Sequence, residues 1–382
     1  MARIRVLVVD DAVVVRKIVT DALASDPDIE VVGAAANGRI ALAKLVQVNP
    51  DVVTMDIEMP EMNGLDALRE LRKTHPVLPV IMFSTLTERG GSATLEALAL
   101  GATDYVTKPA NVGSVAAAQQ RIRDELIPKI KALCGRRVGL VLPRLVATGT
   151  PVTLASARAA RAAVRPIAPP DQRIDIVAIG VSTGGPNALA TILPKLPRDF
   201  PVPIVIVQHM PPVFTRLLAD RLRTSSQLDV REGVVGGVVE PGRVWIAPGD
   251  RHMLVKQGRD GITLALNQNP PENSCRPSVD PLFRSVGEVY GARVLGVILT
   301  GMGQDGLRGS EELTDLGACV IAQDQATSVV WGMPGFVANA GLAERLVPLE
   351  EVAGELVRRG MKGRRGTSSP TTWPATLSPS GA

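Results

Sequence analysis

Five polar residues in the first third of the sequence have the types and positions that chemistry on a phosphoryl group requires. They are Asp10, Asp11, Asp56, Ser84 and Lys108, and each follows or ends a short apolar run. Crowded carboxylates repel one another, and a hard divalent cation with oxygen ligands, Mg²⁺ above all, offsets that repulsion. A hydroxyl group and an ammonium group beside them could hold a phosphoryl group transferred to one carboxylate. We therefore expect a cation site that takes a phosphoryl group.

These residues can meet if the preceding apolar runs are parallel strands of one sheet. Between residue 4 and about 127, amphipathic, helix-like segments separate the β-branched runs IRVLVV, VVGAAA, DVVTMD, VIMFS and DYVTKP. Strands that are apolar on both faces and alternate with helices indicate an α/β domain with a doubly wound parallel sheet. Ligand sites in such sheets gather at the carboxyl edge, where all five polar residues would lie.

A second set of residues, Ser182, His209 and Asp305, has the composition of a hydrolase triad. Ser182 follows an apolar run in the turn GVSTGG, His209 ends the run PIVIVQH, and Asp305 comes shortly after RVLGVILTG. The glycines permit a sharp strand-to-helix turn that exposes the serine near backbone N–H groups. Taken alone, this turn could equally bind a phosphate group. A nucleophile, a base and an orienting carboxylate at three strand ends argue instead for acyl transfer.

The order Ser, His, Asp differs from the Ser, Asp, His order of α/β-hydrolases, although GVSTG formally matches their G-x-S-x-G turn. An α/β-hydrolase would need His252 as its base. Because His252 follows a Pro-Gly-Asp turn in a segment that resembles a hairpin, we interpret it as a surface residue. The hairpin strands expected there are GRVWIAPGDRHMLV and GITLALNQ, an antiparallel insertion in a second α/β domain with a doubly wound parallel sheet.

The 382 residues suffice for two cores, which must be aliphatic because only 3% of residues are aromatic. We place one domain at residues 1–127 and a second at residues 173–360. Between them, residues 128–172 form a basic Ala/Pro-rich linker that carries much of the net charge of +4, and we expect a helical piece near 155–164. Residues 361–382 form a Ser/Thr/Pro-rich tail that we expect to be disordered.

The three cysteines are scattered without CxxC spacing, which fits a reduced, cytoplasmic protein. The sequence shows no signal peptide and no apolar stretch long enough to span a membrane, so no membrane insertion is expected. The basic balance belongs mainly to the linker and does not predict direct binding of nucleic acid.

The first domain resembles the response-regulator receivers, because VVDDA, VVTMDIEMPEMNG, MFST and YVTKP stand in that family's order. The resemblance implies a flavodoxin-like receiver in which Asp56 is the phosphoacceptor and Asp10 and Asp11 join it in holding Mg²⁺. It also implies that Ser84 and Lys108 contact the phosphoryl group. Tyr105 would be the aromatic residue that changes position on phosphorylation.

The second domain resembles the catalytic domain of chemotaxis protein-glutamate methylesterases, the CheB family, through GVSTGGPNAL, QHMPPVFT, CRPSVDPLF and LTGMGQDG. The resemblance implies Ser182 as nucleophile, His209 as general base and Asp305 as its partner. It further implies that the Thr183 hydroxyl supports the histidine and that the Met302 N–H stabilises the oxyanion. The family positions that Arg276 and Asp280 match carry no role that we can derive.

The resemblance implies a phosphorylation-controlled serine hydrolase that removes methyl esters from chemoreceptor glutamates and deamidates glutamines. Its partners would be methylated cytoplasmic helices of chemoreceptors and a histidine kinase as phosphodonor, and ester hydrolysis would need no cofactor. We also expect the unphosphorylated receiver to hinder access to Ser182 across a modest, largely polar interface. A receiver-controlled transcription factor is a competing hypothesis, but residues 173–360 show no helix-turn-helix pattern. A nucleotide-binding module would leave His209 and Asp305 without a role.

Overall fold

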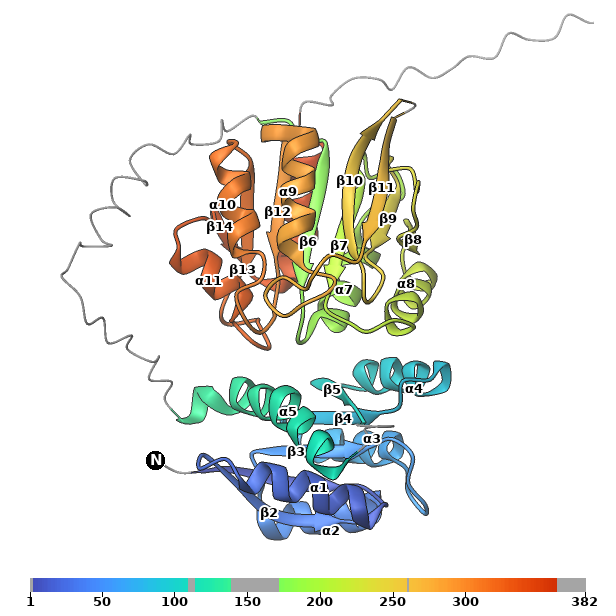
Figure 1. The fold of residues 1–382 in the computed structure, drawn as a ribbon, viewed down its shortest axis with the longest axis vertical. Helices are drawn as coiled ribbons and strands as arrows, with labels where there is room; N and C mark the ends of the chain where they lie inside the picture. The colour runs from blue at the N-terminus through green and yellow to red at the C-terminus, as the bar shows by residue number, and fades with distance from the viewer. Residues whose placement is uncertain (1–2, 109–113, 139–171, 260, 363–382) are drawn as a thin grey trace, which may run out of the picture.

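The computed structural model describes residues 3–108, 114–138, 172–259 and 261–362, which form two α/β domains (Figure 1). The first contains a five-stranded sheet in the order β2-β1-β3-β4-β5, in which every pairing is parallel. This is the doubly wound sheet that the alternating apolar runs predicted. Its strands are β1 (Ile4–Val9), β2 (Ile29–Ala35), β3 (Val52–Asp56), β4 (Val80–Ser84) and β5 (Asp104–Thr107).

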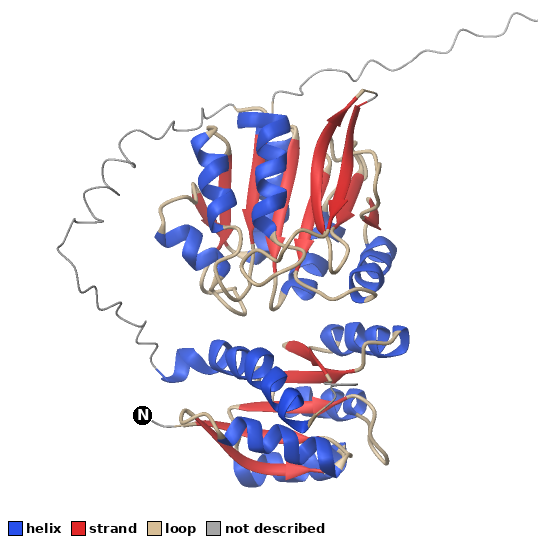
Figure 2. Ribbon diagram, viewed as in Figure 1, coloured by secondary structure: helices blue, strands red, loops and turns tan. Residues whose placement is uncertain are grey.

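Helices cover both faces of the first sheet (Figure 2). They are α1 (Val13–Ala24), α2 (Gly38–Val48), α3 (Gly64–Thr74), α4 (Glu88–Ala99) and α5 (Val115–Val138). Side chains cap four of them: Asn37 accepts a hydrogen bond from the N–H of Ile40, Asn63 from that of Asp66, Thr87 from that of Gly90 and Ser114 from that of Ala117. Gly64 has no substitute, because a Cβ there would lie 2.0 Å from the Asp56 carbonyl oxygen.

The boundary that we expected after residue 127 lies inside α5, which continues to Val138. The physical reason is that Ile130 and Cys134 are buried against the core of the first domain. This packing stabilises the helix beyond residue 127. The helical piece expected near 155–164 and most of the tail fall outside the described residues.

The second domain has a seven-stranded parallel sheet in the order β14-β13-β12-β6-β7-β9-β8. Two further strands pair antiparallel with each other, which bears out the expected insertion. The expectation was wrong about β9, which lies between β7 and β8 in the main sheet and not in the hairpin. The strands are β6 (Ile176–Val181), β7 (Ile204–Gln208), β8 (Asp229–Glu232), β9 (Arg243–Ile246), β10 (His252–Gly258), β11 (Gly261–Asn267), β12 (Val294–Ile298), β13 (Cys319–Gln323) and β14 (Arg345–Val347).

Alternate residues of β6 face different apolar cores, as expected of a strand buried on both sides. Val177 and Ile179 pack with α7, α8 and α12, whereas Ile176 and Ala178 pack with α9, α10, α11 and the hairpin. These helices are α7 (Gly185–Ile192), α8 (Phe214–Ser225), α9 (Val279–Tyr290), α10 (Leu307–Asp315), α11 (Met333–Asn339) and α12 (Leu349–Gly360), with short 3₁₀ turns η1 (Leu193–Lys195) and η2 (Gly291–Arg293). Among the described helices, none has the length and apolarity needed to cross a membrane.

The end of α12 is fixed by a buried ion-pair network around Arg359. Its guanidinium contacts Glu355 at 2.7 Å and both carboxylate oxygens of Glu344 at 3.0 Å. Burial raises the pKa of Glu355, but hydrogen bonds from Arg358 and Arg359 outweigh burial and lower that pKa to about 2. Glu355 therefore stabilises the domain above its ordinary pKa of 4.5, and this stabilisation is lost as the pH falls towards 2.

We predict that Glu355→Gln lowers the free energy of unfolding by about 2 kcal/mol at pH 7, because Arg359 loses a buried charge partner. The deficit should shrink towards pH 3, where wild-type Glu355 also begins to be protonated. Denaturation followed by tryptophan fluorescence measures this, since residues 1–138 contain no tryptophan. Glu350→Gln, which removes an exposed pair with Lys195, is the matched control and should change little. An equal loss at both pH values would contradict the assignment.

Candidate active site and phosphoacceptor site

Strand order and register bring the three proposed triad residues to one edge of the second sheet. β6 lies between β12 and β7, with Gly180 opposite both Ile298 and Val207. Ser182 comes two residues after Gly180, and His209 comes two residues after Val207. The two residues therefore lie next to each other at the ends of adjacent strands. Asp305 lies in the loop between β12 and α10. The carboxyl edge of a parallel sheet is where such loops form binding sites.

The turn that carries Ser182 is tight because two glycines permit it. Gly184 has φ 78°, and a Cβ on Gly185 would lie 1.9 Å from the Gln208 side-chain oxygen. The N–H of Ser182 donates to Thr300, and the N–H of Gly185 donates back to the Ser182 carbonyl oxygen. Ser182 is partly exposed at the start of α7, whereas its neighbours on both sides are buried. This is the exposed strand-to-helix turn expected of a nucleophile.

Asp305 is a buried carboxylate surrounded by hydrogen-bond donors. Burial raises its pKa, but the hydrogen bond with His209 and those from backbone and side-chain donors outweigh burial and lower it. The residue is therefore an anion that can orient an imidazole. Its donors are His209 Nε2 (2.7 Å), Ser278 Oγ (2.7 Å), Val279 N (2.7 Å), Asn273 Nδ2 (2.9 Å), Gly306 N (3.0 Å) and Asp280 N (3.3 Å).

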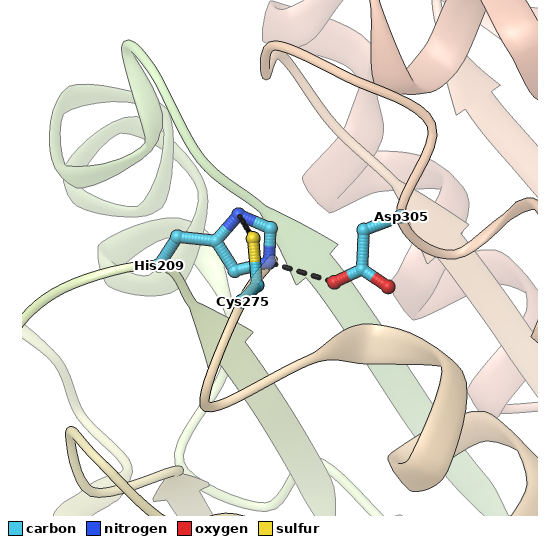
Figure 3. Close-up of side chains that lie close together, drawn as sticks. All are labelled: His209, Cys275 and Asp305. Atoms are coloured by element: carbon cyan, nitrogen blue, oxygen red, sulfur yellow. Dashed lines mark hydrogen bonds and ion pairs between the residues drawn. The ribbon is translucent and has the colours of Figure 1, made fainter. Parts of the chain in front are cut away.

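The ring of His209 lies between Asp305 and Cys275 (Figure 3). Since Nε2 faces a carboxylate, it carries the proton, and Nδ1 is the basic nitrogen. Nδ1 faces the sulfur of Cys275, which is 3.6 Å away. Burial lowers the pKa of His209, but the contacts with Asp305 and Cys275 raise it above its ordinary value. Within the described residues, no hydrogen bond joins His209 to Ser182.

Three contributors to this site were missed by sequence reasoning: Asn273, Cys275 and Ser278, whose hydroxyl donates to Asp305. Asn273 donates 2.8 Å to Asp280 and 2.9 Å to Asp305, from a backbone with φ 52°. An Asn in a Pro-rich loop is a signal for a left-handed turn, but not for its partner. Asp280 also accepts from Gly309 N at 2.7 Å, so it ties the starts of α9 and α10 together.

The remaining expected residues of the second domain are placed as follows. The Thr183 hydroxyl donates 3.0 Å to Asp104 of the first domain, not to His209, so the structure does not give it the expected supporting contact. The Met302 N–H has no hydrogen-bond partner among the described residues and is free to bind an anion. Arg276 pairs with Asp250.

His252 is not the surface residue that we expected, because its side chain is buried at the start of β10. Its Nδ1 accepts from the Ser278 N–H at 3.2 Å, and its Nε2 lies 3.1 Å from the Pro270 carbonyl oxygen. Both ring nitrogens are therefore used to position the loop before α9. The sequence pattern failed here because it does not record that this loop packs against the start of β10 and bonds the His252 ring.

At the carboxyl edge of the first sheet, Lys108 lies between two buried carboxylates. Its Nζ is 2.6 Å from Asp56 Oδ2 and 3.3 Å from Asp10 Oδ2. Apart from this ammonium group, neither oxygen has a hydrogen-bond donor within the described part of the chain. Burial raises the pKa of Asp10 and raises that of Asp56 to about 6, despite the nearby Lys108. With exposed Asp11, these oxygens lie within 4.8 Å of one another, which fits the hard oxygen donor set of Mg²⁺.

Ser84 lies at the same edge, where its carbonyl oxygen accepts from the Lys108 N–H at 2.6 Å, but its hydroxyl is not hydrogen-bonded to the carboxylates among the described residues. Its hydroxyl accepts from Thr94 at 2.6 Å and donates to the Gly90 carbonyl oxygen at 3.1 Å, both on α4. Ser84 therefore connects the edge of the sheet to α4. Tyr105 is buried beside this helix, next to Lys129, whose Nζ is 5.4 Å from its ring centroid.

The two domains are in contact through α4 and β5 on one side and α7 and α8 on the other (Figure 1). Tyr105 stacks on Phe214 with ring centroids 5.2 Å apart, and a Cβ on Gly91 would lie 2.7 Å from Leu217. Arg221 donates 2.5 Å to the Leu95 carbonyl oxygen at the rim. The contact therefore combines an apolar part around Tyr105 and Phe214 with polar contacts, which include the buried hydrogen bond from Thr183 to Asp104 and the ion pair of Arg216 with Glu88.

Comparison with known proteins assigns each half of the chain. Residues 177–356 match the CheB methylesterase family, and residues 6–120 match the response regulator receiver domain. A protein-glutamate methylesterase/protein-glutamine glutaminase of Trichodesmium erythraeum is 51% identical over 94% of this chain and 99% of its own. A protein of the same name from a Nocardioides species is 53% identical over 94% of this chain and 96% of its own.

The catalytic domain of Thermotoga maritima CheB methylesterase, a solved structure, is 44% identical and covers 48% of this chain and 98% of its own, with a TM-score of 0.48. Similarity to the two curated relatives extends over almost the entire length of both partners. The chain therefore belongs to the CheB family of protein-glutamate methylesterases, in which a receiver domain precedes a methylesterase domain.

Proposed function

We propose that Ser182, His209 and Asp305 are the catalytic residues of this methylesterase, with Ser182 as nucleophile. The observation that carries the proposal is the 2.7 Å contact between His209 and a buried, ionised Asp305 at the strand end beside the Ser182 turn. That contact holds the imidazole through Nε2 and leaves Nδ1 as the nitrogen that can take a proton.

In this reaction the Ser182 hydroxyl attacks the side-chain ester carbonyl of a methylated glutamate while Nδ1 of His209 takes the hydroxyl proton. The same nitrogen then gives this proton to the departing methanol, and water resolves the acyl-enzyme by the reverse sequence. The unpartnered N–H of Met302 is suited to stabilise the oxyanion. A glutamine side chain can follow the same path with ammonia as the leaving group.

We expect Ser182→Ala, His209→Ala and Asp305→Ala each to lower the rate of ester hydrolysis by about 10³-fold or more. The reason is that the three side chains act together as one catalytic unit. A double variant should lose far less than the product of the single losses. Methanol release from methylated receptor measures these rates. A His209→Ala enzyme with near-normal turnover, alongside an inactive His252→Ala enzyme, would move the base to β10 and contradict the assignment.

For the receiver, we propose that Asp56 accepts the phosphoryl group and that Asp10, Asp11 and Asp56 hold Mg²⁺. Two buried carboxylates with raised pKa values and one shared ammonium group support this proposal. The cation would supply positive charge against which an anionic donor can approach the carboxylates. Lys108 is placed to contact the phosphoryl group, and Ser84 is placed to pass the change to α4.

We expect a small phosphodonor to label Asp56 only when Mg²⁺ is present, because the uncompensated carboxylates repel the donor. Mass spectrometry of the intact chain and of its peptides locates the label. Asp21→Asn, which changes an exposed acid of α1, is the control and should be labelled like wild type. Labelling that survives Asp56→Asn, or that EDTA leaves unchanged, would contradict the assignment.

We further propose that substrate access is controlled by docking of the receiver. The Thr183 hydroxyl, next to Ser182, is held by Asp104, and Asp104 also pairs with Lys129 of α5 at 2.8 Å. With Tyr105 stacked on Phe214, this places β5 and α4 against the loops that follow β6 and β7. The substrates are proposed to be cytoplasmic helices of chemoreceptors, the phosphodonor a histidine kinase and the location the cytoplasm.

A fragment beginning near Gln172 should be more active than the unphosphorylated full-length enzyme and should not respond to a phosphodonor. If phosphorylation weakens docking of the receiver by about 1.4 kcal/mol, the ratio of released to docked enzyme rises about tenfold, and activity should rise by a similar factor. Arg221→Ala in the full-length chain removes a contact between the domains that involves no triad residue, and it should also raise basal activity. A folded fragment that is slower than the unphosphorylated full-length enzyme would show that the receiver activates, and the docking proposal would fail.

A further inference from the structure

The nitrogen of His209 that acts as the base in the proposed mechanism faces a sulfur atom. Nδ1 lies 3.6 Å from the Cys275 Sγ (Figure 3), and both residues are partly exposed. Nδ1 presents a lone pair, because the ring proton is on Nε2 beside Asp305. A neutral imidazole and a cysteine are the two side chains that Zn²⁺ binds most often.

The separation of the two atoms fits a shared tetrahedral metal ion. Zinc binds imidazole nitrogen at about 2.0 Å and thiolate sulfur at about 2.3 Å, and at a tetrahedral angle these bonds place nitrogen and sulfur about 3.5 Å apart. The observed separation of 3.6 Å is close to this spacing. Two further positions on the ion would remain for water or for an oxygen of a substrate.

Asp305 completes the arrangement without being a ligand. Both of its oxygens already accept hydrogen bonds from backbone and side-chain donors, and one of them holds His209 Nε2 at 2.7 Å. A carboxylate that receives the second ring N–H of a histidine fixes the ring and raises its basicity towards a metal. The catalytic hydrogen bond is thus also the supporting contact that a metal-binding histidine requires.

We propose that His209 Nδ1 and Cys275 Sγ form an inhibitory binding site for Zn²⁺ and similar soft divalent cations. On binding, the thiol loses its proton to solvent and the thiolate and the imidazole nitrogen coordinate the ion. The ion then occupies the nitrogen that must take the Ser182 proton. Binding follows from the geometry alone, whereas inhibition rests on the proposed role of His209.

This site is chemically distinct from the carboxylate cluster of the receiver. Asp10, Asp11 and Asp56 offer only oxygen, which suits Mg²⁺, whereas a thiolate selects softer ions. The other two cysteines, Cys134 and Cys319, are buried, and Cys319 provides a matched control because it lies in β13, on a different strand from the triad.

The first test measures binding without activity, using the full-length chain in excess Mg²⁺ so that the receiver site is saturated. Co²⁺ should give a near-ultraviolet thiolate-to-metal absorption band, and equal Zn²⁺ should displace it. The band should be absent from Cys275→Ala and from Cys275→Ser, and it should be present in Cys319→Ala. Two different replacements of Cys275 are used so that misfolding of one variant does not decide the result. A band that persists in both Cys275 variants, or no band in wild type, would overturn the metal site whatever the catalytic residues are.

The second test measures Zn²⁺ inhibition of methanol release, with each variant compared to its own zinc-free rate. The concentration for half-inhibition should rise more than about tenfold in Cys275→Ala, since one of two protein ligands is gone, and should be unchanged in Cys319→Ala. Equal inhibition of wild type and Cys275→Ala would overturn the inhibitory role. Because the cobalt band does not depend on turnover, failure of the catalytic assignment and failure of the metal site give different results.

Discussion

The hydrogen-bonded carboxylate of Asp305 joins the elements from which the catalytic edge is built. It receives donors from the loop before α9, from the first turn of α9 and from the start of α10, and it orients His209 at the end of β7. A buried anion is costly unless its oxygens are satisfied, so these donors are needed for stability as well as for geometry. The constraint explains why His252 is structural: both of its nitrogens hold the loop that delivers donors to Asp305.

The same edge of the sheet is also the face on which the receiver docks. Turns that carry catalytic groups must leave the strands at their carboxyl ends, and these turns therefore project towards any domain that covers the edge. Contact through Tyr105 and Phe214 is apolar, whereas the bond from Thr183 to Asp104 is polar and adjoins the nucleophile. A contact of this kind can be stable at rest and still be released by a small change in α4, to which Ser84 is hydrogen-bonded.

Much of this architecture was predictable because apolar runs with polar residues at their ends define parallel strands and one functional edge. The positions of Asp10, Asp56 and Lys108 and of the β6, β7 and β12 loops follow from that pattern. Contacts made by loops could not be predicted in this way. Asn273 and Cys275 reach the triad through a turn with positive φ, and hydrophobic periodicity does not show where such a turn packs. The extra turns of α5, the place of β9 and the burial of His252 were misjudged because tertiary packing decides them.

The central claim is that Ser182 is a nucleophile activated by His209 and shielded by the docked receiver. It is tested most directly by the rate at which a serine-directed fluorophosphonate labels the full-length chain, before and after phosphorylation in Mg²⁺, with peptide mapping of the label. The account predicts labelling on Ser182 alone, faster after phosphorylation and abolished in His209→Ala. Labelling of another residue, or of Ser182 at a rate that neither phosphorylation nor His209→Ala changes, would contradict it.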